Sequence, residues 1–199
     1  MYNDYKYIDA GFTYIDPKTG ILINIPEIRD PEVLHFVESV AVTKRLQELY
    51  ENPIKISGIN SLFEIHKYIF QDMYFWAGKK RIVEISKEGK QFFPLAHFDS
   101  AFNYIDNLII DYQCTNVNNK LELALKLAEI LDHVNYLHPF REGNGRAQRE
   151  FLRLLALEKE LILNLNPPDN KSVYLRYMKG TIESDLKILN ELILELIQK

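Results

Sequence analysis

Cysteine is nearly absent from this sequence, and long apolar runs are missing. The single cysteine, Cys114, excludes an internal disulfide, as expected in a reducing compartment. The first residues show no apolar run behind a basic start, so we expect no signal peptide. Charges interrupt every apolar stretch before it reaches the roughly 20 residues of a membrane helix. These absences predict a cytoplasmic protein without a membrane partner.

An excess of basic charge is also lacking. The 24 Lys and Arg residues are outnumbered by 28 Asp and Glu, which gives a formal net charge of -4. A nucleic-acid-binding protein usually presents a cationic surface, so we expect no direct nucleic-acid partner. Internal repeats and low-complexity linkers are absent too, and the chain is long enough for one core. A single domain over 1–199 is therefore predicted.

The chain does contain strong helical periodicity. Asp30 and Pro31 suit the N-cap and first turn of a helix over 33–50, which Asn52-Pro53 ends. Its expected apolar stripe comprises Val33, Leu34, Val37, Val40, Ala41, Leu46 and Leu49. The next helix, about 60–74, has the stripe Leu62, Ile65, Ile69 and Met73. Further helices are expected over about 97–113, 119–136, 145–160 and 171–197, the last with a break near Gly180.

One segment alternates like a β-hairpin. Residues 81–86 read RIVEIS, Glu88-Gly89 is a turn signal, and residues 91–94 read as the returning strand. Residues 21–25 are either a short strand or an extended segment. The predicted fold class is all-α, a helical bundle with one small β-hairpin over 81–94.

The chemistry is concentrated in residues 138–149, HPFREGNGRAQR. Gly143 and Gly145 allow a tight turn and close approach of a ligand to the backbone. The helix that follows offers unpaired N–H groups and a positive dipole end to an anion. Arg146 and Arg149 are three residues apart and so share a face of that helix. Two guanidiniums above such a turn indicate a polyphosphate site, although arginines alone often form only a solvated face.

Two further groups complete this candidate site. Glu142 is badly placed beside phosphates unless a cation lies between them, and Mg²⁺ suits one carboxylate plus phosphate oxygens. His138 titrates near neutral pH and is the candidate general base, which requires an imidazole that is not buried away from solvent. His133 lies five residues earlier and does not share its helix face, so we interpret His133 as structural.

This segment resembles the signature of the Fic family, His-x-Phe-x-(Asp/Glu)-Gly-Asn-Gly-Arg-x-x-Arg. The matched positions are His138, Phe140, Glu142, Gly143, Asn144, Gly145, Arg146 and Arg149. A chance match has a probability on the order of 10^-8. Residues 76–94 are similar to the family's flap region, and the N-terminal part through TGILIN resembles cell-filamentation-type Fic proteins. The resemblance implies a Fic domain with a core at about 55–165 and helical extensions at 1–54 and 166–199, in a bacterial cytoplasm.

The resemblance also implies a reaction, the transfer of AMP from ATP to a Ser, Thr or Tyr hydroxyl of a target protein. His138 would take the hydroxyl proton and Glu142 would hold Mg²⁺. The implied phosphate-binding residues are Gly143, Asn144, Gly145, Arg146 for the β-phosphate and Arg149 for the γ-phosphate. Phe140 would point into the core and pin the loop.

The hairpin is the implied target-binding flap, where an extended target segment would pair along its edge. Its target-binding residues would be Lys87, Glu88, Gly89, Gln91 and Phe92. For Phe92 and Phe93, core and target-clamp roles stay open. Intact Gly143 and Asn144 favour AMP transfer; the alternatives are transfer of another nucleotide-derived group or a nonenzymatic nucleotide-binding scaffold.

Many Fic proteins carry an inhibitory helix with the motif (Ser/Thr)-x-x-x-Glu-(Gly/Asn), whose glutamate pairs with the second motif arginine. This sequence lacks that motif. The nearest match, Glu51-Asn52, has Gln47 where Ser or Thr is required. The resemblance therefore implies a toxin that is held inactive by a separate small antitoxin-like protein.

Overall fold

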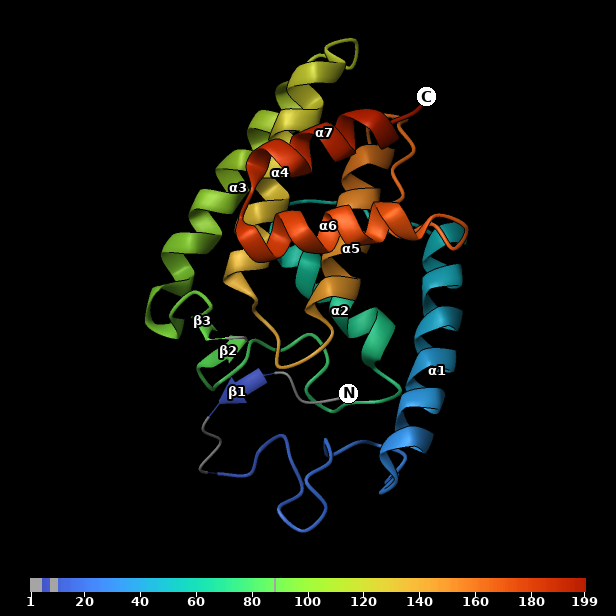
Figure 1. Cartoon of the computed structure of the whole chain (residues 1–199), viewed down its shortest axis with the longest axis vertical. Helices are drawn as coiled ribbons and strands as arrows, with labels where there is room; N and C mark the ends of the chain where they lie inside the picture. Colours follow the sequence, from blue (N-terminus) through green and yellow to red (C-terminus); the bar gives the residue numbers. More distant parts are fainter. Residues whose placement is uncertain (1–4, 8–10, 88) are drawn as a thin grey trace.

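A computed structural model describes residues 5–7, 11–87 and 89–199, and helices predominate there. The helices are α1 (Pro31–Glu51), α2 (Asn60–Phe70), α3 (Phe98–Cys114), α4 (Lys120–Leu137), α5 (Asn144–Leu157), α6 (Lys171–Glu183) and α7 (Leu186–Leu196), with a 3-10 turn η1 at Leu95–His97 (Figure 1). The strands are β1 (Tyr5–Tyr7), β2 (Ile85–Lys87) and β3 (Lys90–Gln91). The predicted all-α class with a small β element is confirmed.

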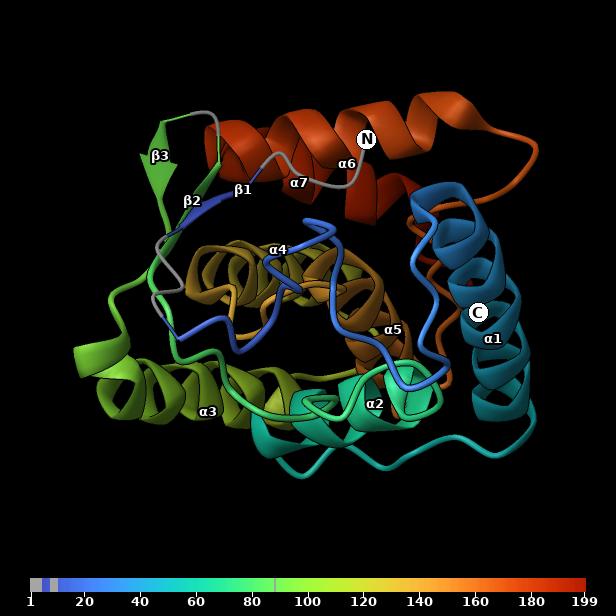
Figure 2. The ribbon, with the colours of Figure 1, turned by 90° about the horizontal axis from the view of Figure 1, so that it is seen from below.

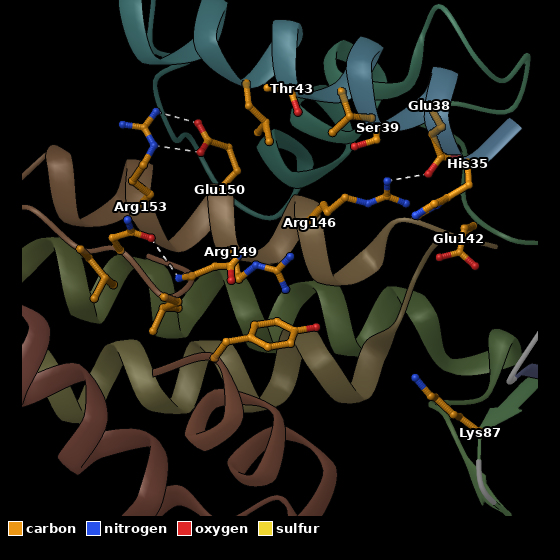
Figure 3. A pocket seen from close by; sticks show the side chains of 17 residues that line it. His35, Glu38, Ser39, Thr43, Lys87, Glu142, Arg146, Arg149, Glu150 and Arg153 are labelled. Carbon is orange, nitrogen blue, oxygen red and sulfur yellow. Dashed lines mark hydrogen bonds and ion pairs between the residues drawn. The ribbon is translucent and has the colours of Figure 1, made fainter. Parts of the chain in front are cut away.

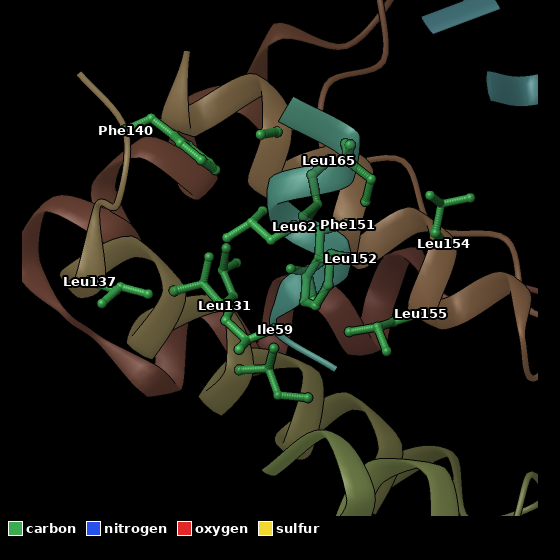
Figure 4. Close-up of a cluster of buried hydrophobic side chains, with 14 of the residues drawn as sticks. Ile59, Leu62, Leu131, Leu137, Phe140, Phe151, Leu152, Leu154, Leu155 and Leu165 are labelled. Atoms are coloured by element: carbon green, nitrogen blue, oxygen red, sulfur yellow. The ribbon is translucent and has the colours of Figure 1, made fainter. Parts of the chain in front are cut away.

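The helices form layers with α4 and α5 in the middle (Figure 2). α2 and α3 lie on one side, α6 and α7 lie on the other, and α1 packs beside α2. The middle layer holds fully buried side chains such as Leu131, Phe151 and Leu152 (Figure 4). Each such burial contributes about 1.5–3 kcal/mol. The loop that joins α4 to α5, residues 138–143, therefore begins and ends on firmly held helices.

Helix α1 begins as predicted and buries most of the expected stripe. The Asp30 carboxylate accepts from the backbone N–H groups of residues 32 and 33, both at 2.9 Å, and Pro31 fills the first turn. Two members of the expected apolar stripe, Val33 and Val40, are 49% and 55% exposed. The buried line of the helix is Leu34, Glu38, Val42 and Leu49. The other members of the stripe are buried or partly buried, as expected, and what the pattern missed is Glu38, a charged residue in a central buried position.

Helix α2 ends four residues earlier than predicted, at Phe70, and a turn follows. The backbone N–H groups of Met73 and Tyr74 both donate to Phe70 O, at 2.9 and 3.0 Å. All four members of its predicted stripe are buried. The stripe was correct because the turn after Phe70 keeps Met73 in the hydrophobic core.

The predicted hairpin is real but much shorter than 81–94. Its strands are only β2 and β3, and residues 81–84 are irregular. Alternation predicted a strand there because Arg81 and Val83 are buried while Ile82 is exposed. The buried Arg81 side chain, described below, takes the backbone away from strand pairing. Residues 21–25 contribute only an isolated bridge between Ile15 and Leu22, so they are extended rather than a strand.

Strand β1 was not predicted, and it changes which edges of the hairpin are open. It pairs antiparallel with β2, with Tyr7 opposite Ile85 and Tyr5 opposite Lys87. The sheet order is β1-β2-β3. A target segment could therefore extend this sheet, within the described residues, only along β3 or by displacing β1.

The C-terminal tail breaks at Ser184, not near Gly180. Ser184 has a left-handed φ of 51°, and the Asp185 carboxylate caps α7 by accepting from Ile188 N–H at 3.0 Å. Gly180 lies inside α6, where a Cβ would approach Leu189 Cδ2 to 2.5 Å. The glycine therefore permits close packing of α6 on α7. In the described part of the chain, no helix combines the length and apolarity needed to cross a membrane.

Candidate active site

The loop at 138–143 is held in a tight turn by its own residues. Both amide ends of Asn144 bind Phe140, since its Oδ1 accepts from Phe140 N–H at 2.9 Å and its Nδ2 donates to Phe140 O at 2.8 Å. Gly143 has a φ of +81°, and a Cβ there would lie 2.4 Å from the Phe70 ring. Asn144 is only 3% exposed. The side chain predicted to hold phosphate is thus engaged in shaping the loop.

His138 lies at the start of this loop with a left-handed φ of 44°. Its Nδ1–H donates to Asn135 O at 3.0 Å, so Nε2 carries the lone pair that can accept a proton. Burial lowers the pKa of the imidazole to about 3, which keeps it neutral at pH 7.

The exposure expected for His138 is nearly absent. Phe92 stacks on the imidazole with ring centroids 3.7 Å apart, and the residue is 6% exposed. His138 nevertheless lines a cavity, described below. Phe92 thus covers His138, whereas Phe93 packs edge-on against Tyr136, and a target-clamp role for either ring stays a prediction.

Arg81 ties the flap, which we define as residues 81–94, to the loop. Its backbone N–H donates to Pro139 O at 2.7 Å and its Nε–H donates to His138 O at 2.9 Å. Its two Nη groups donate to Val83 O and Phe93 O, near the two ends of the flap. One buried guanidinium thus fixes the flap and the His138 carbonyl together. The sequence signal that could have revealed this role is the position of Arg81, a cation at the start of an alternating apolar run.

His66 is a second residue whose role the sequence did not indicate. Gly78 N–H donates to its Nδ1 at 2.9 Å, so Nε2 carries the hydrogen and donates to Glu142 O, also at 2.9 Å. Its ring stacks on Phe140 at 3.7 Å, and burial lowers its pKa to about 3. Phe140 is fully buried in the core, as expected. The neutral imidazole braces the loop against α2.

Glu142 is the carboxylate closest to the loop amides. Its Oε1 accepts from Gly143 N–H at 3.0 Å, and burial raises the pKa of the carboxyl. The described residues contain no group of three His, Cys, Asp or Glu side chains that could hold a metal ion by themselves. A single hard oxygen donor whose burial disfavours an isolated negative charge fits Mg²⁺ that is completed by phosphate oxygens.

The two motif arginines have different surroundings. Arg146 donates from Nη1 to Glu38 Oε1 at 2.5 Å, and Phe70 lies 4.6 Å below its Cζ. Arg149 lies over the rings of Tyr174 and Tyr177, at 5.5 and 5.3 Å. Across the described residues, no carboxylate lies within ion-pairing distance of Arg149. Its charge is therefore available to an incoming anion.

Two cavities meet at the N-terminus of α5. The flap cavity, about 270 Å³, lies between the flap, α5 and α6 and includes His138, Phe92, Gly143 and Gly145. The α1 cavity, about 640 Å³, lies between α1, α5 and residues 163–166 (Figure 3). Their shared wall consists of Lys87, Glu142, Arg146, Arg149 and Tyr174. The structure thus brings together the predicted base, carboxylate and arginines.

The remaining flap predictions have mixed outcomes. Lys87 lines both cavities, whereas Gln91 is exposed and lines neither. Gly89 forms the turn with a φ of +81°, and Glu88 lies outside the described residues. Lys90 was missed, and its Nζ donates to Ile182 O at 2.8 Å, which links the flap to α6. The lining residues on α6 carried no motif and could not be found from sequence.

The near match to the inhibitory motif is not at the site. Glu51 is the last residue of α1, is exposed, and lines neither cavity. The sequence prediction that the chain lacks an inhibitory glutamate of that motif agrees with this position.

Comparison with known proteins identifies the family. The chain is 36% identical over 156 residues to protein adenylyltransferase VbhT of Bartonella schoenbuchensis, covering 77% of this chain but only 32% of VbhT, about a third of its length. It is 32% identical to the probable protein adenylyltransferase Fic of Salmonella typhimurium, over 76% of each chain.

Solved structures and a family model agree with these relatives. A Fic domain of a Bartonella sp. AR 15-3 effector superposes with a TM-score of 0.82 at 17% identity, covering 97% of this chain and 94% of that one. The BepC protein of Bartonella tribocorum with bound AMPPNP gives 0.80 at 17% identity, over 96% and 99%. At this identity the likeness shows the fold. The Fic/DOC family model matches residues 56–156, about half of the chain, and the protein therefore belongs to the Fic/DOC family.

Proposed function

We propose that this protein is an adenylyltransferase that moves AMP from ATP to a hydroxyl of a target protein. The observation that carries the proposal is the shared wall between the two cavities. The wall offers two guanidiniums at a helix N-terminus, and a neutral imidazole lines the flap cavity beside it. That arrangement suits a triphosphate whose α-phosphorus faces the base. The relatives named as protein adenylyltransferases support the same reaction.

The proposed step conserves atoms and charge. The target oxygen attacks the α-phosphorus while its proton passes to Nε2 of His138. The bond between the α-phosphorus and the bridging oxygen to the β-phosphate breaks, and pyrophosphate leaves. Arg146 holds the β-phosphate and Arg149 holds the γ-phosphate. The backbone N–H groups from Gly143 to Arg146 donate hydrogen bonds to phosphate oxygens. Most of the acceleration comes from positioning and charge stabilisation.

Glu142 is the residue that would hold Mg²⁺ with the nucleotide. When bound, the ion neutralises charge on the phosphates. Burial already raises the pKa of this carboxyl, and a neighbouring cation would favour its ionised form. Asn144 contributes through the loop backbone that it fixes, since its amide binds Phe140.

Target binding must bring a hydroxyl to the base. Phe92 stacks on the face of His138 and both residues line the flap cavity, so a Ser, Thr or Tyr side chain would approach Nε2 from that cavity beside Phe92. We assign target contact to Lys87, Gly89, Gln91 and Phe92 of the flap, and propose the same for Glu88. Because β1 already pairs with β2, a target segment would add to β3 or replace β1.

Control by a separate protein completes the proposal. Arg149 has no carboxylate partner among the described residues, so a glutamate from a small antitoxin-like inhibitor could pair with it and exclude the γ-phosphate. We propose a bacterial cytoplasmic toxin of the cell-filamentation type. Affinity purification of this chain from cells that also produce its inhibitor should recover a small partner protein that suppresses AMP transfer. A purified chain that is fully active without any such partner would contradict this control.

Labelled ATP tests the reaction itself. Purified protein is incubated with Mg²⁺, a bacterial lysate and ATP labelled on the α- or the γ-phosphate, with the His138→Ala variant alongside. Label from the α position alone, lost in the variant, supports AMP transfer. Label from the γ position would indicate phosphoryl transfer, and no labelled protein would indicate a nucleotide-binding scaffold; either result refutes the proposal.

A further inference from the structure

Glu38 is a buried carboxylate that the reaction proposed above does not use. It lies on α1, is 1% exposed, and precedes residues 56–156, the span of the family match. Its Oε1 accepts from Arg146 Nη1 at 2.5 Å, and its Oε2 accepts from the Tyr74 hydroxyl. Figure 3 shows Glu38 projecting from α1 toward Arg146. Burial of a carboxylate is costly unless both oxygens are paired, and here both are.

These contacts hold Arg146 from two sides. Glu38 binds one end of the guanidinium, while the Phe70 ring lies 4.6 Å from its Cζ. An arginine side chain otherwise loses considerable rotamer entropy when a ligand orders it. An arginine that is already ordered avoids that loss on binding. The Arg146 side chain retains 28% exposure and lines both cavities.

The position of Glu38 relative to Arg146 decides whether its carboxylate supports or weakens phosphate binding. A carboxylate near a phosphate site should weaken binding if it faces the phosphate directly. Glu38 lines only the α1 cavity, whereas Arg146 lines both. Arg146 therefore stands between Glu38 and the flap cavity. Hydrogen bonds to charged groups are worth more than neutral ones, so ordering of the guanidinium should outweigh the more distant repulsion.

We propose that Glu38 is a positioning residue that fixes the Arg146 guanidinium for the β-phosphate of the nucleotide. The proposal rests on the adenylyltransferase function for the identity of the ligand. It also means that α1, which the family match does not cover, supplies part of the phosphate site. Tyr74 extends the support by orienting the carboxylate.

Nucleotide binding to two variants tests this role. Glu38→Ala removes both contacts, whereas Glu38→Gln keeps an oxygen that accepts from Arg146 and an amide that donates to the Tyr74 hydroxyl. Calorimetry with AMP, ADP and AMPPNP, each with Mg²⁺, should show Kd values for ADP and AMPPNP raised about tenfold or more by Glu38→Ala. AMP should change less than about twofold, and Glu38→Gln should restore most of the loss. Glu48→Ala is the matched control, because Glu48 is on α1 but pairs with Arg45.

A second measurement needs no nucleotide. The nitrogen-15 heteronuclear NOE of the Arg146 Nε–H should be high in the parent protein and in Glu38→Gln, as for a rigid side chain. It should be low in Glu38→Ala, as for a mobile one. If that pattern appears while no nucleotide binds the parent protein, the adenylyltransferase function fails and the positioning role stands. An equally rigid Arg146 in Glu38→Ala would overturn the proposal. Unchanged or tighter ADP binding, or an equal loss for AMP, would overturn it too.

Discussion

The two cavities at the N-terminus of α5 differ in how they are built. The flap cavity is small and contains stacked rings, with Phe92 on His138 and Tyr177 against Arg149. The α1 cavity is more than twice as large and is lined by charges, among them Glu38 and Arg153. Their shared wall holds the carboxylate and the two arginines of the signature. The comparison teaches that the motif supplies most of this wall, while each cavity takes its own character from segments outside the motif.

The difference suggests a division of labour. The enclosed flap cavity suits the part of a nucleotide near the reacting phosphorus, because water exclusion strengthens electrostatic interactions there. The wider α1 cavity leaves the arginines open to a competing carboxylate from an inhibitor. Variants that change one cavity but not the other can test this division.

Replacing the base should have the largest effect and should spare the α1 side. General-base catalysis contributes about 10²–10⁴ in rate, so we expect His138→Ala to lower the transfer rate about 10³-fold. ATP affinity should change only about twofold, because the arginines remain. Transfer of α-label at saturating ATP measures the first value and calorimetry the second. His133→Ala, on α4 just before His138 but packed against Tyr104, is the control; comparable transfer by both variants would refute the assigned base.

Removing the second arginine should have the next largest effect. Arg149→Ala removes the guanidinium assigned to the γ-phosphate, and we expect transfer to fall about 10²-fold, as for loss of one strong transition-state contact. Arg176→Ala on α6, which removes an exposed pair with Glu195, should be nearly neutral. The kcat/KM for ATP distinguishes them. Near-normal transfer by Arg149→Ala would show that γ-phosphate anchoring is wrong.

The brace beneath the wall should appear in the pH dependence of stability. Burial lowers the pKa of His66 to about 3, below the value of about 6.5 in an unfolded chain. Below pH 6.5 the His66 imidazole therefore binds a proton in the unfolded state but not in the folded state, so stability is lost as pH falls below 6.5. Between pH 7 and pH 5, the free energy of unfolding measured in urea should fall by about 2 kcal/mol less in His66→Gln than in the parent protein. Parallel pH profiles would contradict the buried neutral imidazole.

The smallest expected change concerns the cover of the flap cavity. Phe92→Ala should expose His138 and raise its pKa by about one unit or more, since burial is the main cause of the low value. An NMR titration of the imidazole measures this shift. Phe93→Ala is the matched control, because Phe93 packs on Tyr136 instead. Equal His138 pKa values in the two variants would mean that Phe92 is not the cover.

Sequence reasoning succeeded where local chemistry decides. The carboxylate and arginines of residues 138–149 lie in one turn and the first turns of the helix that follows it, so their spacing sufficed to predict a common wall. The Asp30 cap is equally local. Helix positions followed from periodicity. The end of α2 was predicted too late because the apolar pattern continues into the turn after Phe70.

What could not be predicted depends on contacts between distant segments. Glu38 broke the apolar stripe of α1 because its partner Arg146 lies 108 residues later. The strand assigned to 81–84 failed because Arg81 binds the loop at His138. Pairing of β1 with β2 joins the N-terminus to the flap, and no local pattern encodes it. These long-range contacts are what surround the site and orient its groups.

A crystal structure with AMPPNP and Mg²⁺ tests the central claim most directly. The account predicts a triphosphate at the N-terminus of α5, with its α-phosphorus toward His138 and its γ-phosphate at Arg149. Nucleotide bound elsewhere, or a loop at 138–143 that stays empty at saturating nucleotide, would contradict it.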